Sequence, residues 1–155
     1  MQLADILSEE SVIFCADVTS KRDILHRLSE RVAAQSGQPV EAVFEAVDSR
    51  EALGSTGLGN GIAIPHGKLP GLNGVTAAFA RLDKPVEFDA LDDQPVDLVM
   101  MLLAPVGAGA DHLKALATVA RLLRSESVVE RLRQLRDPAR LYAVLAGPVA
   151  THQAA

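Results

Sequence analysis

The sequence predicts an α/β protein of one domain, with a mixed parallel and antiparallel sheet sandwiched between helices. Apolar residues recur at steps of three and four, as in amphipathic helices, on both sides of the middle of the chain. The middle itself holds three apolar runs typical of strands, at residues 75–82, 86–88 and 96–104. The connection between 82 and 96 is too short for a crossover helix, so some neighbouring strands must be antiparallel.

Two helices are expected before these strands. Ser20, followed three residues later by Asp23, is typical of a capping box at a helix start, and Gly37 suits the end of that helix. Pro39 suits the first position of the second helix. A short strand near residues 12–18 is expected to precede both.

Three further helices are expected after the last strand. Apolar stripes predict them over residues 113–123 and 128–135, and Asp137 with Pro138 predicts a capped helix that continues to residue 145. The domain is therefore assigned to residues 1–147, and residues 148–155 are expected to form a flexible tail.

Composition excludes several classes of function. The chain has 155 residues, is 48% hydrophobic and 23% charged, and is long enough to bury a core of its own. A net charge of -5 and 3% aromatic residues argue against a nucleic-acid partner. No apolar run is long enough to cross a membrane, and the start lacks the features of a signal peptide, so we expect a cytoplasmic protein. Cys15 is the only cysteine and is expected to act as a small apolar residue.

The segment GSTGLGNGIAIPHGK, residues 54–68, gathers five glycines around one histidine. Glycine-rich loops can cradle phosphates, but the glycines here alternate as G-x-G-x-G rather than G-x-G-x-x-G. A P-loop would also need Ser or Thr where Leu69 stands. These departures argue against a nucleotide, and no cofactor is expected. The glycines could instead let another protein approach His66 closely.

An imidazole such as that of His66 can accept a phosphoryl group at one nitrogen while the other nitrogen makes a hydrogen bond. The plainer interpretation is a polar residue in a loop. A nearby cluster of carboxylates lacks the spacing of an EF-hand and is expected to mark solvated turns, so no metal site is predicted. Its members are Asp89, Asp92, Asp93 and Asp97.

Three segments of the chain, in order, resemble a known family. They are REALGSTGLGNGIAIPHGKLPGL, VEFDALDDQPVDLVMMLLAP and DHLKALATVARLL. They are similar to enzyme IIA of the fructose/mannitol class of the bacterial phosphoenolpyruvate-dependent phosphotransferase system, and most of all to its nitrogen-related branch. The resemblance extends from about residue 3 to residue 145. It implies a mixed sheet between helices and a phosphoryl group that His66 receives from a phosphohistidine carrier protein.

The resemblance also implies roles for other residues. His112 matches a second active-site histidine, which would donate an N–H to a phosphoryl oxygen or orient His66; alternatively, His112 is an ordinary first-turn residue beside a helix cap at Asp111. Arg50 matches an arginine near the phosphoryl group, although a cation also suits the end of a helix. Lys68 would steer phosphate or simply be solvated.

Two further sets of residues have two interpretations each. Members of the glycine-rich segment would contact the phosphoryl group or only shape a turn: Ser55, Thr56, Gly57 and Asn60. Apolar residues beside them would form a ring that docks the carrier, or would pack inward: Leu58, Ile62 and Leu69.

The expected function is that of a regulatory phosphoryl carrier in the nitrogen-related branch, with a covalent phosphohistidine rather than independent turnover. Its partners would be an HPr-like carrier of that branch, and sensor or transport proteins whose binding depends on phosphorylation. One alternative is a separate-chain, sugar-specific enzyme IIA that passes phosphoryl to a IIB partner for fructose or mannitol uptake. Another is a metal hydrolase using His66 and His112, which would need further ligands.

Overall fold

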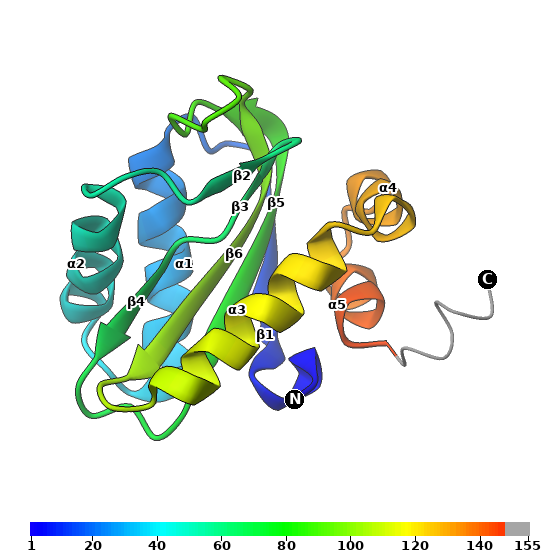
Figure 1. Ribbon diagram of the computed structural model, residues 1–155. Coiled ribbons are helices and arrows are strands. Elements are labelled where there is room, and N and C mark those ends of the chain that lie inside the picture. Colours follow the sequence, from blue (N-terminus) through cyan, green and yellow to red (C-terminus); the bar gives the residue numbers. More distant parts are fainter. Residues whose placement is uncertain (148–155) are drawn as a thin grey trace.

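The centre of the molecule is a six-stranded mixed sheet with helices on both faces (Figure 1). A computed structural model describes residues 1–147. The strands are β1 (Leu7–Cys15), β2 (Gly57–Gly59), β3 (Ile62–Ala63), β4 (His66–Leu69), β5 (Thr76–Val86) and β6 (Val96–Pro105). The helices are the short 3-10 helix η1 (Leu3–Asp5), α1 (Lys21–Ser36), α2 (Val40–Glu51), α3 (Gly109–Leu123), α4 (Glu126–Gln134) and α5 (Pro138–Ala146).

Strand β6 organises the sheet, whose order is β1-β5-β6-β3-β2 with β4 also paired to β6. It runs antiparallel to β5, which confirms the antiparallel pairing expected from the short connection. It runs parallel to both β3 and β4. The chain thus follows β6 twice, first at residues 62–63 and then at 66–69, with a break at Ile64 and Pro65 between the two pieces.

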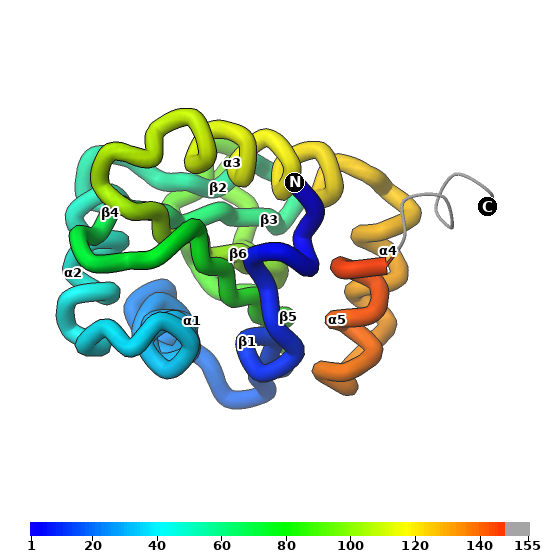
Figure 2. Tube along the Cα trace, turned by 90° about the horizontal axis from the view of Figure 1, so that it is seen from below, coloured from blue at the N-terminus to red at the C-terminus, as the bar shows by residue number. Residues whose placement is uncertain are grey.

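Each face of the sheet has its own apolar core. Because side chains alternate along a strand, Val99, Met101 and Leu103 of β6 face α1 and α2, whereas Leu98 and Met100 face the other helices. Figure 2 shows α1 and α2 apart from α3, α4 and α5, with strands between the two groups. The mixed sheet between helices is therefore confirmed, and so is the burial of β6 on both faces.

Local sequence signals determine where several helices begin and end. The Ser20 hydroxyl oxygen accepts a hydrogen bond from the backbone N–H of Asp23 (3.1 Å), and Gly37 ends α1 with a φ of 77°. The Asp137 side chain accepts a hydrogen bond from the N–H of Ala139 at the start of α5. These boundaries agree with the sequence-based prediction.

Other boundaries differ from the prediction. Strand β1 already begins at Leu7, five residues before the predicted start. The sequence did not indicate these residues because the stretch Ser-Glu-Glu-Ser is polar throughout and the strand pairing is irregular there. The predicted strand at 86–88 is not separate, since β5 continues to Val86. Pro39 is the residue before α2 rather than its first residue. Helix α3 begins after Ala108, so Asp111 lies within its first turn and is not its cap.

Three further expectations concern the cysteine, membrane-spanning helices and the C-terminal residues. Cys15 is buried, in agreement with its apolar interpretation. Over residues 1–147, no helix combines the length and the apolar character needed to cross a bilayer. The tail predicted at residues 148–155 lies outside the described residues.

Candidate functional site

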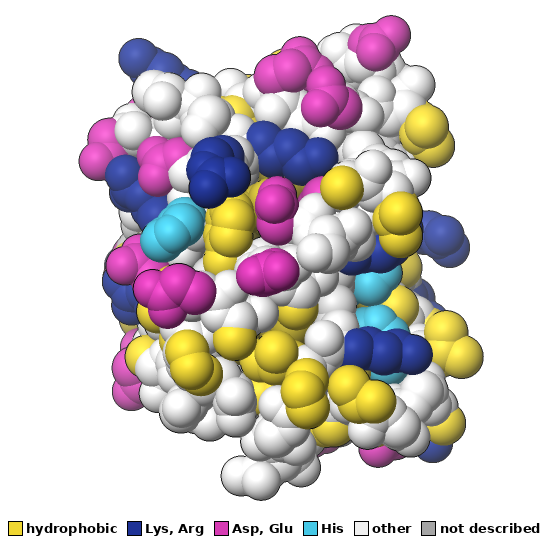
Figure 3. Space-filling model, turned by 90° about the vertical axis from the view of Figure 1, so that its left-hand side faces the viewer, with side chains coloured by type: hydrophobic (Ala, Val, Ile, Leu, Met, Phe, Trp, Pro, Cys, Tyr) yellow, Lys and Arg dark blue, Asp and Glu magenta, His cyan; other side chains and the backbone are white. Residues whose placement is uncertain are grey.

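Two histidines from distant parts of the chain meet beside the sheet. His66 is the first residue of β4 and His112 lies in the first turn of α3, and both elements flank β6. Their ring centroids are 5.5 Å apart, with the ring planes inclined by 50°. Figure 3 shows two neighbouring histidine side chains at the surface, next to a basic side chain. The structure therefore brings together the two histidines that the sequence singled out.

The ring of His66 is held in one orientation by the backbone two residues before it. Its Nδ1 lies 2.8 Å from the carbonyl oxygen of Ile64. A carbonyl oxygen can only accept a hydrogen bond, so Nδ1 carries the proton and donates. In the neutral ring, the lone pair is then on Nε2. His66 is half-buried, and its nucleophilic nitrogen is the one not committed to the backbone.

His112 is the more enclosed of the two, with 7% of the residue exposed. Its Nδ1 is buried and makes no hydrogen bond within residues 1–147. Burial lowers the pKa of His112, and the neighbouring His66 and Lys68 lower this pKa further because a second positive charge beside them is unfavourable. His112 is therefore biased towards the neutral form, with hydrogen-bonding capacity that the fold leaves unused.

The two faces of β4 have different surroundings. His66 and Lys68 are two residues apart and share one face, on which Lys68 is exposed and close enough to affect His112. Gly67 points the other way, against α2. A Cβ atom at Gly67 would lie 2.8 Å from the carbonyl oxygen of Ala46, so only glycine allows this approach of β4 to α2.

The hydroxyl groups of the glycine-rich loop have partners within the protein. Thr56 is buried, and its hydroxyl and backbone N–H both donate to the carboxylate of Glu51. The Ser55 hydroxyl donates to the carbonyl oxygen of Phe88 (2.9 Å) and accepts from the N–H of Gly57 (3.0 Å). Because of these bonds, Ser55 and Thr56 first of all fix the loop itself. Sequence reasoning missed Glu51, whose burial at the end of α2 has no local signal.

Arg50 lies at the end of α2, one turn beyond Ala46. Its Nη1 donates to the carbonyl oxygen of Gly54 (2.9 Å), which ties the helix end to the glycine-rich loop. Since α2 runs opposite to β4 (Figure 1), Arg50 is displaced from Ala46 towards the His66 end of that strand.

Asn60, by contrast, occupies the turn between β2 and β3 with a φ of 58°. Its N–H donates to Asp92 (3.1 Å) and its carbonyl oxygen accepts from Arg133 of α4 (2.6 Å).

The apolar residues predicted near the site divide into two groups. Ile62 and Leu69 are 5% and 8% exposed and pack inward, one into each core. Leu58 is 49% exposed. The exposure of Val106 and Leu113 was not predicted from the sequence. The sequence places Leu113 on the apolar stripe of its helix, but the buried side of α3 contains the adjacent His112 instead.

The acidic residues around β6 form turns and an ion pair. Asp97 accepts hydrogen bonds from the guanidinium group of Arg133, with Nη2 to Oδ1 at 2.8 Å. Asp89 and Asp93 have positive φ values, as turn residues do. Within the described part of the chain, no three residues among His, Cys, Asp and Glu gather as metal ligands. The hydrolase alternative therefore finds no third ligand for His66 and His112 there.

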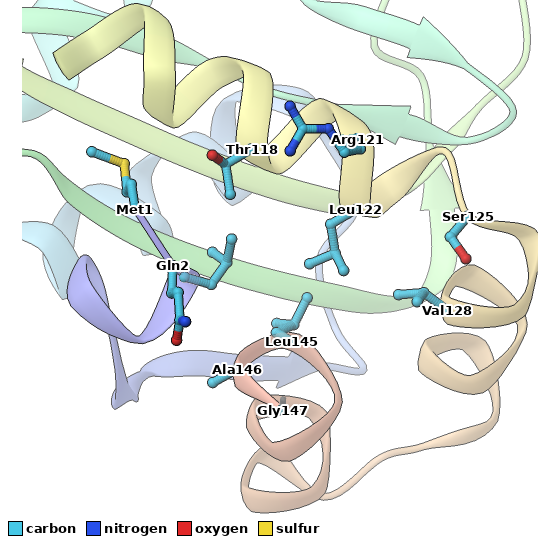
Figure 4. A pocket seen from close by; sticks show the side chains of 11 residues that line it. Met1, Gln2, Thr118, Arg121, Leu122, Ser125, Val128, Leu145, Ala146 and Gly147 are labelled. Atoms are coloured by element: carbon cyan, nitrogen blue, oxygen red, sulfur yellow. The ribbon is translucent and has the colours of Figure 1, made fainter. Parts of the chain in front are cut away.

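Two cavities lie away from the histidines. One, of about 270 Å³, opens between η1, α3 and α5, with Leu3, Leu122 and Leu145 among its walls (Figure 4). The other, of about 480 Å³, lies between Leu58 and Arg133. Neither is lined by His66 or His112, so the histidine pair is not enclosed by either cavity.

A mixed sheet between helices, with two histidines side by side next to its central strand, can be compared with known protein families. The family model described as "Phosphoenolpyruvate-dependent sugar phosphotransferase system, EIIA 2" matches residues 5–147. The chain therefore belongs to this family.

Within the family, its relatives include nitrogen regulatory proteins. One, from Bradyrhizobium diazoefficiens, is 50% identical over 151 residues, covering 97% of this chain and 99% of that protein. Another, from Escherichia coli, is 42% identical over 147 residues, covering 94% and 90%. These findings confirm the resemblance drawn from the three sequence segments.

Solved structures agree with this assignment. The crystal structure of nitrogen regulatory protein IIA-Ntr from Neisseria meningitidis is similar with a TM-score of 0.86 and 36% identity, covering 92% of this chain and 98% of that chain. The crystal structure of mannitol IIA from Escherichia coli has a TM-score of 0.75 at 24% identity, covering 90% and 98%. The second similarity supports the fold alone.

Proposed function

We propose that this protein is a phosphoryl-accepting regulatory component of the nitrogen-related phosphotransferase system, with Nε2 of His66 as the acceptor. The proposal rests above all on one contact, the hydrogen bond from Nδ1 of His66 to the carbonyl oxygen of Ile64 (2.8 Å). This contact leaves the lone pair on Nε2, where a phosphocarrier can deliver its phosphoryl group.

The transfer is a displacement at phosphorus. The Nε2 lone pair of His66 forms a new N–P bond while the N–P bond of the donor phosphohistidine breaks, and its electron pair returns to the donor ring. Such a transition state is loose, with charge on the three equatorial oxygens. The positive charge that develops on the His66 ring is stabilised because Nδ1–H remains bonded to the Ile64 carbonyl.

Neighbouring groups supply what the equatorial oxygens need. His112, whose lowered pKa favours the neutral form, donates one ring N–H to a phosphoryl oxygen. Lys68 and Arg50 add positive charge, and Arg50 has guanidinium N–H groups beyond the one bonded to Gly54. The hydroxyl groups of Ser55 and Thr56 contribute through the shape of the loop rather than by direct contact.

Partner proteins dock on the exposed surface around the histidines. Two exposed apolar side chains, Leu113 beside His112 and Val106 in the loop before α3, suit the docking of a phosphohistidine carrier of the HPr-like nitrogen branch. Leu58 is also exposed but lines the cavity near Arg133. Phosphorylation adds about two negative charges at His66, which changes the affinity for proteins that bind this surface. The family suggests sensor or transport proteins as targets, in the cytoplasm.

The test is phosphorylation by defined carriers. Purified protein is mixed with phosphoenolpyruvate, enzyme I and either the nitrogen-branch or the sugar-branch carrier, and its intact mass is measured. We expect one added phosphoryl group with the nitrogen-branch carrier, lost in His66→Ala and kept in His26→Ala, whose ring packs on Phe44 instead. Modification of His66→Ala, or none in the wild type, would contradict the proposal. Preference for the sugar-branch carrier would favour the sugar-specific alternative.

A further inference from the structure

A buried carboxylate lies behind the glycine-rich loop, and we infer that it positions the phosphoryl acceptor. In this inference, which rests on the proposed function, Glu51 sets the orientation and tautomer of His66 through Thr56 and the backbone of Ile64. Glu51 touches neither the phosphoryl group nor the carrier, so it is a positioning residue.

The carboxylate of Glu51 is almost completely enclosed, with 3% of its side chain exposed. The ammonium group of Lys21, at the start of α1, lies 2.8 Å from its Oε1. The same ammonium group donates a hydrogen bond to the carbonyl oxygen of Phe88 (3.4 Å) and lies 4.6 Å from the centre of the Phe88 ring. A buried charge persists only when it is paired in this way. Lys21 therefore holds Glu51 and is itself held by Phe88.

Thr56 connects this carboxylate to the loop. Its hydroxyl donates to Oε2 of Glu51 and its N–H donates to Oε1 (3.4 Å). The carbonyl oxygen of Thr56 accepts the N–H of Ile64 (3.1 Å), and the carbonyl oxygen of Ile64 accepts Nδ1–H of His66. The contacts thus run from Lys21 through Glu51, Thr56 and Ile64 to the ring of His66.

Ile64 is the point at which this support acts. It lies in the break between β3 and β4, so no sheet pairing to β6 is made by the residue itself. Its N–H is bonded to Thr56 instead, and Pro65, which follows, has no N–H to offer. A shift of Thr56 therefore moves the carbonyl group that orients His66. Displacements of about 1 Å can slow a reaction about a hundredfold.

The Thr56 hydroxyl offers a matched pair of variants. Thr56→Val has nearly the same shape but lacks the hydroxyl that donates to Glu51 and keeps only the backbone N–H, whereas Thr56→Ser keeps both donors. Nitrogen-15 shifts of the His66 ring, measured in the unphosphorylated protein, report its tautomer without any carrier. We expect one dominant Nδ1–H tautomer in the wild type and in Thr56→Ser, and a mixture in Thr56→Val and Glu51→Gln.

Phosphoryl transfer gives the second readout. We expect Thr56→Val and Glu51→Gln each to slow transfer from the carrier about tenfold, and the double variant to be no slower than either single one, since both remove the same support. Thr56→Ser should keep the wild-type rate.

The inference is overturned if both variants lower Tm but keep the wild-type ring shifts and transfer rate, because Glu51 would then only stabilise the fold. Should Glu51→Gln not fold, the Thr56→Val and Thr56→Ser pair decides by itself. Failure of the wild type to accept phosphoryl would refute the proposed function, while the ring shifts would still decide the role of Glu51.

Discussion

The two sides of the histidine pair are built differently. On the β4 side, His66 is bonded to the Ile64 carbonyl and the strand backbone packs directly against α2. On the α3 side, the helix begins after Ala108, which makes no side-chain capping hydrogen bond, and Nδ1 of His112 is buried without a hydrogen bond within residues 1–147. In the proposed function, the acceptor ring is therefore held in place before the reaction, whereas Nδ1 of the neighbouring ring is bound by no group within residues 1–147. Such preorganisation is the main source of transition-state stabilisation in many enzymes.

The largest expected effect tests whether His112 serves the proposed reaction. His112→Ala should slow phosphoryl transfer to His66 by about a hundredfold, the usual loss when one preorganised donor is removed. In this variant the tautomer of His66 should be unchanged, because the hydrogen bond from its Nδ1 to the carbonyl oxygen of Ile64 remains. Rapid-quench kinetics with Lys114→Ala, an exposed neighbour on α3, as control measure this. A His112→Ala rate equal to that of the control would show that the two sides do not cooperate.

The second prediction compares packing on the two sides through two glycines. Gly67→Ala should lower the free energy of unfolding by about 1–3 kcal/mol, since its Cβ would lie 2.8 Å from the backbone oxygen of Ala46. Gly109→Ala is the matched control on the α3 side, where a Cβ meets no atom within 4 Å. Urea denaturation measures both. Equal losses would mean that β4 is not packed more tightly than the start of α3.

The third prediction concerns pH, because the pKa of folded His112 lies below the ordinary value of 6.5. As pH falls through 6.5, the unfolded chain binds a proton at this residue before the folded protein does. The free energy of unfolding therefore decreases between 6.5 and the lowered pKa, and this contribution levels off below it. Denaturation across this range should show the decrease in the wild type and a smaller one in His112→Asn. A difference between the two that does not vary with pH would contradict a lowered pKa.

The smallest expected effect is the influence of the charge of Lys68, on the β4 side, on the pKa of His112, on the α3 side. Lys68→Gln removes a positive charge that helps to lower the pKa of His112, so this pKa should rise towards 6.5. NMR titration of the His112 ring measures this pKa in both proteins. Because salt screens the charge of Lys68, the difference in pKa between the wild type and Lys68→Gln should become smaller as salt is added. A fall in the pKa would mean that Lys68 acts through packing rather than through charge.

How much the sequence predicts depends on how local the signal is. The start of α1 at Ser20 and its end at Gly37 depend on neighbouring residues, and both were predicted correctly. The burial of β6 on both faces follows from its continuous apolar run. The histidine pair could be proposed only from the resemblance to a family, because β4 and α3 are joined through the sheet rather than through the sequence.

The support around the site escaped prediction for the same reason. The burial of Glu51 depends on Lys21, thirty positions earlier, and on Phe88, far beyond it. Leu113 fits an apolar stripe in sequence, yet the rotation of α3 against the sheet leaves it 68% exposed and turns His112 inward. Tertiary packing decides such cases, and periodicity alone does not report it.

The parallel pairing of β1 with β5 has a consequence for how the chain folds. Strands β5 and β6 are close in sequence, whereas the pairing of β1 with β5 closes a loop that contains two helices and the whole glycine-rich segment. Because closing a longer loop costs more entropy, we expect β5 and β6 to pair before β1 joins them. Lys21 directly follows β1 and its turn. We therefore expect the ion pair that supports Thr56 to be among the last contacts formed, so that a nascent chain acquires its reactive histidine geometry only as folding is completed.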